Sequence, residues 1–309
     1  MEIVTFEKEM AAGVARCYNE LVQPMPYPRP VAREAFADFS HAQLQDCTEE
    51  EILVVRQAGE VAGFAHVGVS APPTHKWHIE GEPGVIRFLS YRRGERPVGA
   101  ALLQAAEQWV RERERTAIVA EYGGYMYPFY PFPLGNISER ISHVPPLFGM
   151  AGYEVPECEV FFEWWGFEPP EVSAPEVEVE FVCKQAQTEA SGFKVSVAAM
   201  QGEKQVGEFS MVSLREDRWR PQFTDWCTAG LLRVADRLQG RGIGKCLMAR
   251  GLAEMRKAGA RHAMISTDWN NYRAYLFYTN FGFEFLDRTF GFRKELGGTR
   301  CGAEQTTIG

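Results

Sequence analysis

The feature that most constrains the fold is a weak internal repeat, in which three short patterns recur in the same order. Residues 59–64 read Gly-Glu-Val-Ala-Gly-Phe and residues 202–209 read Gly-Glu-Lys-Gln-Val-Gly-Glu-Phe. Each follows an apolar, strand-like run, so each predicts a hairpin turn. Helix-like stretches then open at Gly99 and Gly244, and Gly-Tyr-Glu at 152–154 parallels Gly-Phe-Glu at 282–284. The recurrence predicts one fold used twice.

The junction between the two copies is visible in the composition. Strand-like residues 160–165 are followed by residues 166–175, which contain prolines at 169, 170 and 175. Prolines at this density interrupt regular structure and suit a linker. We therefore predict an N-terminal lobe over 1–168 and a C-terminal lobe over 169–309.

Apolar periodicity predicts the elements of each lobe. For the N-terminal lobe it predicts strands at 2–6, 52–57, 61–69, 85–90 and 116–121, with helices at 9–21, 32–44 and 98–114. For the C-terminal lobe it predicts strands at 177–184, 193–200, 206–213, 229–234 and 263–267, helices at 242–258 and 271–281, and a hairpin within 283–295. The second lobe thus lacks the two helices that the first places between its first and second strands.

Composition excludes several classes of protein. The net charge of −8 argues against a broad nucleic-acid surface, and no run approaches eighteen apolar residues, so we expect no membrane span. Met1 leads directly into strand-like residues, without a secretory signal. Seven scattered cysteines without a Cys-x-x-Cys pattern indicate a reduced, cytoplasmic protein.

The glycine loop, residues 239–244, is the first candidate for chemistry. It reads Gln-Gly-Arg-Gly-Ile-Gly, follows the apolar strand at 229–234 and opens an amphipathic helix. Backbone amides of such a turn, together with the free N–H groups of the helix, form an anion site. Glycines let a diphosphate approach, and Arg241 and Lys245 can add charge. Taken alone, the pattern is equally open to an ordinary glycine-rich helix start.

A second pattern, Asn-x-x-Ala-x-x-Phe-Tyr-x-x-x-Gly-Phe, occupies residues 271–283. With both patterns in order, the sequence resembles the GNAT superfamily of acyl-CoA N-acyltransferases. The first signature of that family is matched by Gln239, Gly242 and Gly244. The second is matched by Asn271, Ala274, Phe277, Tyr278, Gly282 and Phe283. The resemblance is good over 190–295 and faint over 1–165. It implies an α/β (α+β) fold of two tandem GNAT-like lobes, each a mixed, mostly antiparallel sheet flanked by helices.

The resemblance also implies roles for particular residues. Acetyl-CoA would be the co-substrate, with its pantetheine along the backbone amides of Leu232 and Val234 and its diphosphate on Gln239, Gly240, Arg241, Gly242, Ile243, Gly244 and Lys245. Tyr278 would be the general acid that protonates the leaving thiolate. A core aromatic is the competing interpretation of Tyr278. Asn271 would bridge to the cofactor or to the strand end, and an ordinary helix N-cap competes with that role.

The general base is left open. Asp225, Asp268 and Glu208 are possible carboxylates near the cleft, and a solvated surface acid is the competing interpretation of each. His262 is expected outside the site. His75 and His78 are spaced for a metal but have no evident third ligand, so we predict no metal site.

The N-terminal lobe has lost the matching chemistry. Alignment of Gly99 with Gly244 puts Pro97, which has no amide proton, at the place of Gly242. Alignment of Gly152 with Gly282 puts Phe148 at the position that corresponds to Tyr278, and phenylalanine cannot be an acid. The aromatic insertion at 122–132 is either a substrate cradle or a packed loop or lobe interface. Arg92, Arg93 and Arg96 are either CoA ligands or a surface cluster.

The sequence therefore predicts an N-acetyltransferase that moves an acetyl group from acetyl-CoA to a small-molecule or peptide amine by direct attack. The C-terminal lobe would be the catalytic one. We expect no nucleic-acid or membrane partner, and a monomer or weak dimer. The alternatives are a non-catalytic acyl-CoA-binding or regulatory protein, and a structural pseudodimer of two lobes.

Overall fold

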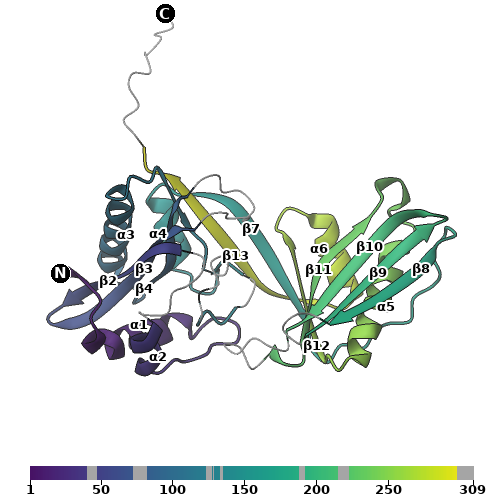
Figure 1. Cartoon of the computed structure of the whole chain (residues 1–309), viewed down its shortest axis with the longest axis horizontal. Helices are drawn as coiled ribbons and strands as arrows, with labels where there is room; N and C mark the ends of the chain where they lie inside the picture. The colour runs from purple at the N-terminus through teal and green to yellow at the C-terminus, as the bar shows by residue number, and fades with distance from the viewer. Residues whose placement is uncertain are drawn as a thin grey trace, which may run out of the picture. The chain divides into compact units, whose positions relative to one another are not determined.

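The computed structural model describes residues 1–39, 47–71, 82–122, 127, 129–132, 135–187, 192–214 and 223–297. It divides into two compact units (Figure 1). Unit 1 comprises Met1–Cys158 together with the chain from Arg288 onward, and unit 2 comprises Glu159–Asp287. Neither unit follows the boundary after residue 168 that the composition suggested.

Unit 1 is a sheet with helices on both faces. Its strands run in the order β1 (Glu2–Thr5), β2 (Cys47–Gln57), β3 (Glu60–Ser70), β4 (Gly84–Tyr91), β5 (Ala117–Ala120) and β13 (Glu284–Glu295), with β6 (Ile137–Ser138) also on β13. Among the strand pairs of its described residues, β4–β5 is parallel and the others are antiparallel. Its helices are η1 (Lys8–Met10), α1 (Ala11–Val22), α2 (Arg33–Phe39), α3 (Arg96–Arg111) and α4 (Val144–Met150).

Adjacent residues of β3 show how the two faces are covered. Phe64 packs on Phe36 of α2, at a ring separation of 5.7 Å. Its neighbour Gly63 faces α3, where an added Cβ would lie 3.0 Å from Val98 and from Leu102. Because successive side chains of a strand point to opposite faces, α2 and α3 lie on opposite sides of this sheet.

Unit 2 repeats the sheet but covers it differently. Its strands run in the order β7 (Glu154–Trp164), β12 (His262–Asp268), β11 (Trp226–Val234), β10 (Lys204–Ser213), β9 (Phe193–Gln201) and β8 (Glu180–Gln187). In the part of this unit that the structure describes, β11–β12 is parallel and the other strand pairs are antiparallel. Helices α5 (Ile243–Lys257) and α6 (Tyr272–Phe281) follow β11 and β12, with the short η3 (Asp236–Leu238) before α5. The expected mixed, mostly antiparallel sheets are thus confirmed for both units.

Helix α5 forms where the apolar period predicted it. Ile243, Leu247, Met248, Leu252 and Met255 are all at most 1% exposed and belong to one core cluster. The helix ends at Lys257, and Gly259, just beyond the C-cap Ala258, adopts a left-handed φ of +98°. The predicted absence of two helices is also confirmed, because β8 leads into β9 where unit 1 inserts α1 and α2 between β1 and β2.

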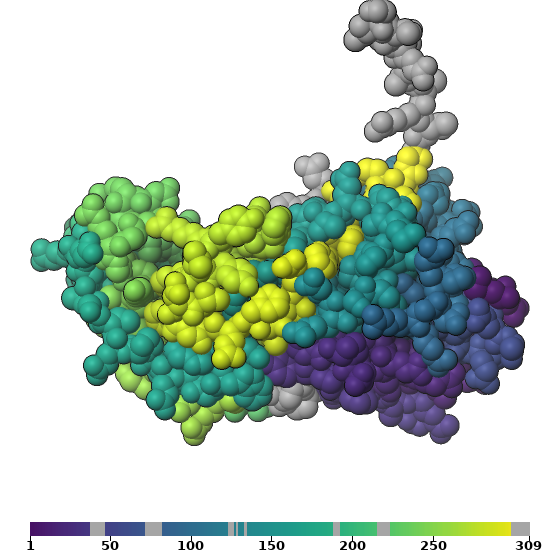
Figure 2. Space-filling model, turned by 180° about the vertical axis from the view of Figure 1, so that it is seen from behind, coloured from purple at the N-terminus to yellow at the C-terminus, as the bar shows by residue number. Residues whose placement is uncertain are grey.

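The predicted hairpin within 283–295 is wrong: these residues form the single strand β13. Its first four residues belong to unit 2, and from Arg288 onward it belongs to unit 1. Gly291 packs closely against Glu157 of β7, because a Cβ there would lie 3.3 Å from that side chain. The end of β13, coloured yellow, lies against residues of unit 1 in the surface view (Figure 2).

Strand β7 is the counterpart of β13. It begins in unit 1, and its residues 159–164 pair with β12 in unit 2. The chain therefore passes between the units twice, each time inside a strand. No helix in the described part of the chain is long and apolar enough to span a membrane.

Candidate functional site

The glycine loop lies between η3 and α5, and two of its glycines have a backbone that other residues rarely adopt. Gly240 has φ +82° and Gly242 has φ +85°, both in the left-handed region. Gly242 is the N-cap of α5, and no side chain caps this helix among the described residues. The first-turn amides of α5, which have no intrahelical acceptor, are therefore left for another partner.

Gly244 is small for a different reason. It lies inside α5, and a Cβ added there would come no closer than 3.8 Å to the ring of Phe277 and 3.9 Å to Val234. These are ordinary contact distances, so the chain itself does not require glycine at this position. Its missing side chain leaves room on the side of α5 that faces a cavity.

Strand β11 separates from β12 partway along its length. The two strands share three register pairs, from Trp226–His262 to Thr228–Met264, whereas β11 continues to Val234. Its pairing with β10 has a bulge near Gly230 and is regular beyond it. The Ala235 amide donates to Val206 O on the β10 side at 2.8 Å. Since amides alternate along a strand, those of Leu232 and Val234 point to the other side, where β12 no longer pairs.

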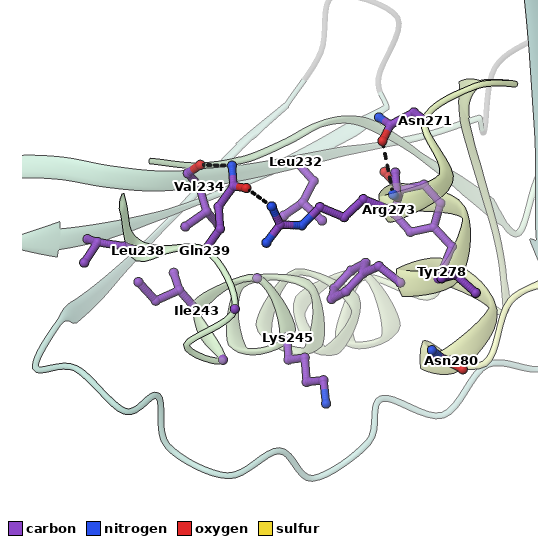
Figure 3. A pocket seen from close by; sticks show the side chains of 16 residues that line it. Leu232, Val234, Leu238, Gln239, Ile243, Lys245, Asn271, Arg273, Tyr278 and Asn280 are labelled. Carbon is purple, nitrogen blue, oxygen red and sulfur yellow. Dashed lines mark hydrogen bonds between the residues drawn. The ribbon is translucent and has the colours of Figure 1, made fainter. Parts of the chain in front are cut away.

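Gln239 joins three elements around this opening. Its Nε2 donates to Val234 O at 2.9 Å and to Asp236 Oδ1 at 2.8 Å. Its Oε1 accepts a hydrogen bond from Arg273 of α6 (Figure 3). The amide side chain thus fixes the end of β11 and draws Arg273 over the glycine loop.

Helix α6 carries the two other predicted residues. Asn271 is its N-cap, and its side chain accepts a hydrogen bond from Ala274 N at 3.2 Å, so the capping interpretation is confirmed. Tyr278 is 6% exposed, and its ring meets Phe162 of β7 edge-on at 5.8 Å. Burial raises the pKa of the Tyr278 hydroxyl to about 12. Tyr278 is therefore a core aromatic, and it also lines the cavity.

One cavity of about 450 Å³ collects these features (Figure 3). The residues that the sequence predicted for the site and that line this cavity are Leu232, Val234, Gln239, Gly240, Gly242, Ile243, Gly244, Lys245, Asn271 and Tyr278. Other lining residues are Leu238, Arg273, Ala274, Leu276, Phe277 and Asn280. Of the predicted site, Arg241 alone does not line the cavity; its carbonyl accepts a hydrogen bond from Glu176 N at 3.0 Å.

Arg273 and Asn280 are polar lining residues that the sequence analysis missed. Both stand at variable positions of the second pattern, where residue type carries no signal. Helical spacing was the available clue: Arg273 and Asn280 are seven residues apart, which is two turns, so both lie on the face of α6 that includes Ala274 and Phe277.

None of the candidate bases lines the cavity. Glu208 pairs with Arg233 at 2.6 Å, Asp225 lies 3.5 Å from His262, and Asp268 is exposed at the end of β12. Their interpretation as surface acids fits these positions. His75 and His78 lie outside the described residues, within which there is no cluster of three or more possible metal ligands.

The equivalent opening of unit 1 is filled by its own side chains. Strands β4 and β5 also share three register pairs and then separate. There the Tyr122 hydroxyl accepts from Leu89 N at 3.0 Å and donates to Leu89 O at 3.1 Å. Tyr122 is fully buried and packs on Phe88. The packed-loop interpretation of the aromatic insertion is therefore confirmed for its described residues.

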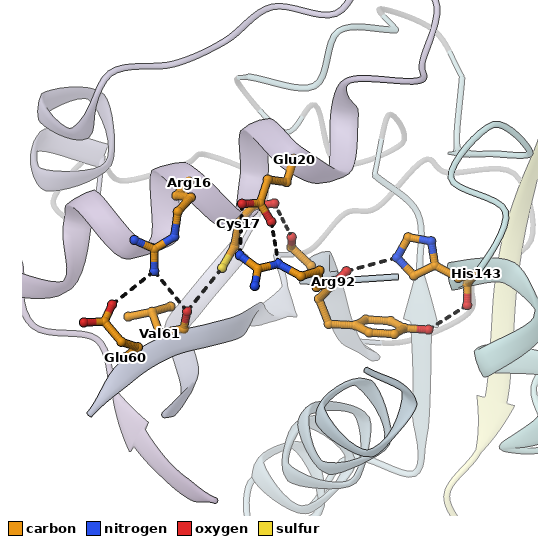
Figure 4. Close-up of polar contacts among 9 residues, drawn as sticks. Arg16, Cys17, Glu20, Glu60, Val61, Arg92 and His143 are labelled. Carbon is orange, nitrogen blue, oxygen red and sulfur yellow. Dashed lines mark hydrogen bonds and ion pairs between the residues drawn. The ribbon is translucent and has the colours of Figure 1, made fainter. Parts of the chain in front are cut away.

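Backbone amides at the start of α3 also have hydrogen-bond partners within unit 1. Pro97 lies in its first turn, and the amides of Val98 and Gly99 both donate to Glu95 O. Arg92 forms two hydrogen bonds with Glu20 of α1, at 2.9 and 3.0 Å (Figure 4). Phe148 is buried and stacks on Phe292 of β13 at 4.9 Å.

Comparisons with known proteins agree with this architecture. Residues 158–283 match the model of the acetyltransferase (GNAT) family. The matched region contains both of the sequence patterns. A search of curated proteins finds no match.

Solved structures extend the likeness to both units. A tandem GNAT protein from the clavulanic acid biosynthesis pathway is 14% identical, with a TM-score of 0.57 over 96% of this chain and 99% of its own. A GCN5-related N-acetyltransferase from Sphaerobacter thermophilus is 15% identical, with a TM-score of 0.61 over 99% of this chain and 98% of its own. At these identities the likeness establishes the fold, a tandem GNAT arrangement.

Proposed function

We propose that the protein is an acyl-CoA-dependent N-acyltransferase that uses acetyl-CoA and works in the cavity of unit 2. The GNAT fold supports this activity in general. One observation carries the proposal: a single cavity is lined by the uncapped start of α5, by the open edge of β11 and by the hydroxyl-bearing Tyr278.

These three features match the diphosphate, the pantetheine and the thioester of acetyl-CoA. The diphosphate would rest on the amides from Gly242 to Lys245, where the positive end of the helix dipole adds to direct hydrogen bonds. Pantetheine would lie along β11 and bond to the amides of Leu232 and Val234. The thioester would then reach the region of Tyr278.

The reaction follows from this placement. The amine nitrogen of the acceptor attacks the thioester carbonyl carbon, the carbon–sulfur bond breaks, and Tyr278 gives its proton to the leaving sulfur. The new amide nitrogen loses its extra proton to water, and Tyr278 is reprotonated from solvent. A pKa near 12 keeps the Tyr278 hydroxyl protonated at neutral pH, as an acid requires.

Unit 1, which holds most of the degenerate lobe expected over 1–168, has no catalytic role in this proposal. Tyr122 occupies the Leu89 amide, and Phe148 cannot supply a proton. We propose a small-molecule or peptide amine as the acceptor. The described residues contain no further feature that selects between these two classes.

Calorimetric titration of the full chain with acetyl-CoA tests the proposal. We expect one site per chain, followed by turnover with a member of an amine panel. Two sites per chain would contradict the assignment of unit 1. Binding without turnover for any amine would favour a non-catalytic acyl-CoA-binding protein, and the absence of binding would overturn the proposal.

A further inference from the structure

The connection between β7 and β8, residues 165–179, is ordered although it contains neither helix nor strand. We call it the strap. One anchor is Phe167, which is fully buried and whose amide donates to Arg261 O at 3.1 Å. At the other end, Val177 and Val179 pack against the core of unit 2. A segment that only linked β7 to β8 would need no such anchors.

Between its anchors the strap contacts the outside of the glycine loop. Glu176 N donates to Arg241 O at 3.0 Å, and Ser173 O accepts a hydrogen bond from Cys246 Sγ at 3.4 Å. Pro175 lies so close that a Cβ added to Gly242 would be 3.3 Å from its Cα. Three contacts within four residues of the strap thus fall on the N-cap of α5 and the residues around it.

The hydrogen bond to Arg241 fixes the direction of an amide that could bind a ligand. The Arg241 carbonyl and the Gly242 N–H belong to one planar, trans peptide group, so they point in opposite directions. Because the carbonyl is held toward the strap, the Gly242 N–H is held away from it. Gly242 lines the cavity of unit 2, so this amide is available on the cavity side of the loop.

We infer that the strap is a positioning element for the phosphate-binding loop: Glu176, through its backbone amide and Arg241, orients the Gly242 amide toward the diphosphate of acyl-CoA. The inference rests on the proposed function. It makes the connection between β7 and β8 part of the cofactor site, although no strap residue lines the cavity. The prolines at 169, 170 and 175 support this role, because they lower the entropy that an ordered strap gives up.

The test compares two cofactors and three variants of the full chain. Glu176→Pro removes the amide proton, whereas Glu176→Gln keeps it and changes only the side chain. Glu171→Pro places a proline elsewhere in the strap and serves as the matched control. Acetyl-CoA is compared with acetyl-pantetheine, which has the thioester but no diphosphate.

We expect Glu176→Pro to weaken acetyl-CoA binding about tenfold, which is the loss of one hydrogen bond to a charged group. KM for acetyl-CoA should rise with kcat unchanged, since only uniform binding is lost. Turnover of Glu176→Pro with acetyl-pantetheine should stay within about twofold of the wild-type rate, because this cofactor has no diphosphate whose binding could be lost. Glu176→Gln and Glu171→Pro should behave as the wild type with both cofactors.

Several outcomes would overturn the inference. If Glu176→Pro binds acetyl-CoA as tightly as the wild type does, the inference is wrong while the proposed function stands. The same holds if turnover with acetyl-pantetheine falls as much as that with acetyl-CoA, or if Glu171→Pro shows an equal loss. If Glu176→Pro fails to fold, Pro175→Gly replaces it, with the same selective loss for acetyl-CoA expected. A wild-type protein that binds no acetyl-CoA would instead overturn the proposed function.

Discussion

The two units contain the same opening between parallel strands, and only in unit 1 does the chain fill it. β4–β5 and β11–β12 each separate after three register pairs. Leu89 pairs with Ala65 as Leu232 pairs with Phe209, so the two leucines are equivalent. The Leu89 amide is bonded to the Tyr122 hydroxyl, whereas Leu232 lines a cavity. Two residues beyond the last register pair, unit 1 has Tyr122 and unit 2 has Ser266.

The helix starts beside these openings show the same contrast: the start of α3 in unit 1 is closely packed, and the start of α5 in unit 2 is open. A Cβ on Gly99 of α3 would lie 2.6 Å from the Tyr91 ring, whereas one on Gly244 of α5 would find no atom within 3.8 Å. The same residue type is thus a packing requirement in one unit and leaves open space in the other. The comparison teaches that the repeat preserved the framework of a site while side chains decided whether the site is open.

The largest effect is expected from cutting the repeat in two at the boundary that the composition suggests. Fragment 172–309 lacks Phe162 and Trp164 of β7, which pack in the core of unit 2 and against Phe283. We expect this fragment to be unfolded by circular dichroism and without activity. A folded fragment with full turnover would show that unit 2 does not need β7.

The next largest effect concerns Tyr278 and its equivalent Phe148. Tyr278→Phe removes the proposed acid, so kcat should fall about 100-fold while the Kd for acetyl-CoA is unchanged. Tyr275→Phe, on the same helix, is the control and should keep its rate. The alkaline limb of the rate profile should appear only as the pH nears the Tyr278 pKa of about 12, because the acid form persists below it. Unchanged kcat in Tyr278→Phe would remove the tyrosine from the mechanism.

The paired glycines allow a smaller, reciprocal test. Gly244→Ala should weaken acetyl-CoA binding about tenfold, because the new methyl group enters the cavity, with little change in Tm. Gly99→Ala should leave binding unchanged but destabilise the fold by about 1–3 kcal/mol through its clash with Tyr91. Calorimetry and thermal unfolding of both variants measure the four quantities. Parallel behaviour of the two variants would contradict the difference between the helix starts.

The smallest effect on activity and on acetyl-CoA binding is expected from Tyr122→Phe. The change leaves the Leu89 amide and carbonyl without their hydroxyl partner, which should cost about 1–3 kcal/mol of unfolding free energy. Activity and the stoichiometry of acetyl-CoA should not change, because the ring still fills the opening. Denaturant unfolding provides the measurement, and a second acetyl-CoA site in this variant would mean that the hydroxyl alone closes unit 1.

Much of the site could be predicted because its signals are local. The glycine loop lies within a few residues of the strand and helix that it joins, and Gly240 and Gly242 have the backbone that made glycine informative. Tyr278 was found by its place in a pattern. Arg273 was missed because its role arises from a hydrogen bond to Gln239, 34 residues earlier in the chain.

The exchange of strands could not be predicted from periodicity. Nothing in the residues of β13 specifies a partner that lies far earlier in the sequence, at Ala117–Ala120. Asp287, Arg288 and Gly291 resemble turn residues, although the first is buried and the last packs closely against Glu157. The sequence left the role of the aromatic insertion around Tyr122 open, because the bond from Tyr122 to Leu89 depends on tertiary contact.

The exchange of β13 has a consequence for how the protein is made. Domains generally fold in order as the chain leaves the ribosome, the N-terminal one first. Unit 1 departs from that order, because β5 at Ala117–Ala120 receives its neighbour from residues 292–295, far later in the sequence. Until those residues have been made, the nascent chain carries an open strand edge, which is a template for mispairing. Each newly made molecule is therefore exposed to aggregation during that interval, and a ribosome that stops before residue 292 releases a protein in which the first unit is unfinished.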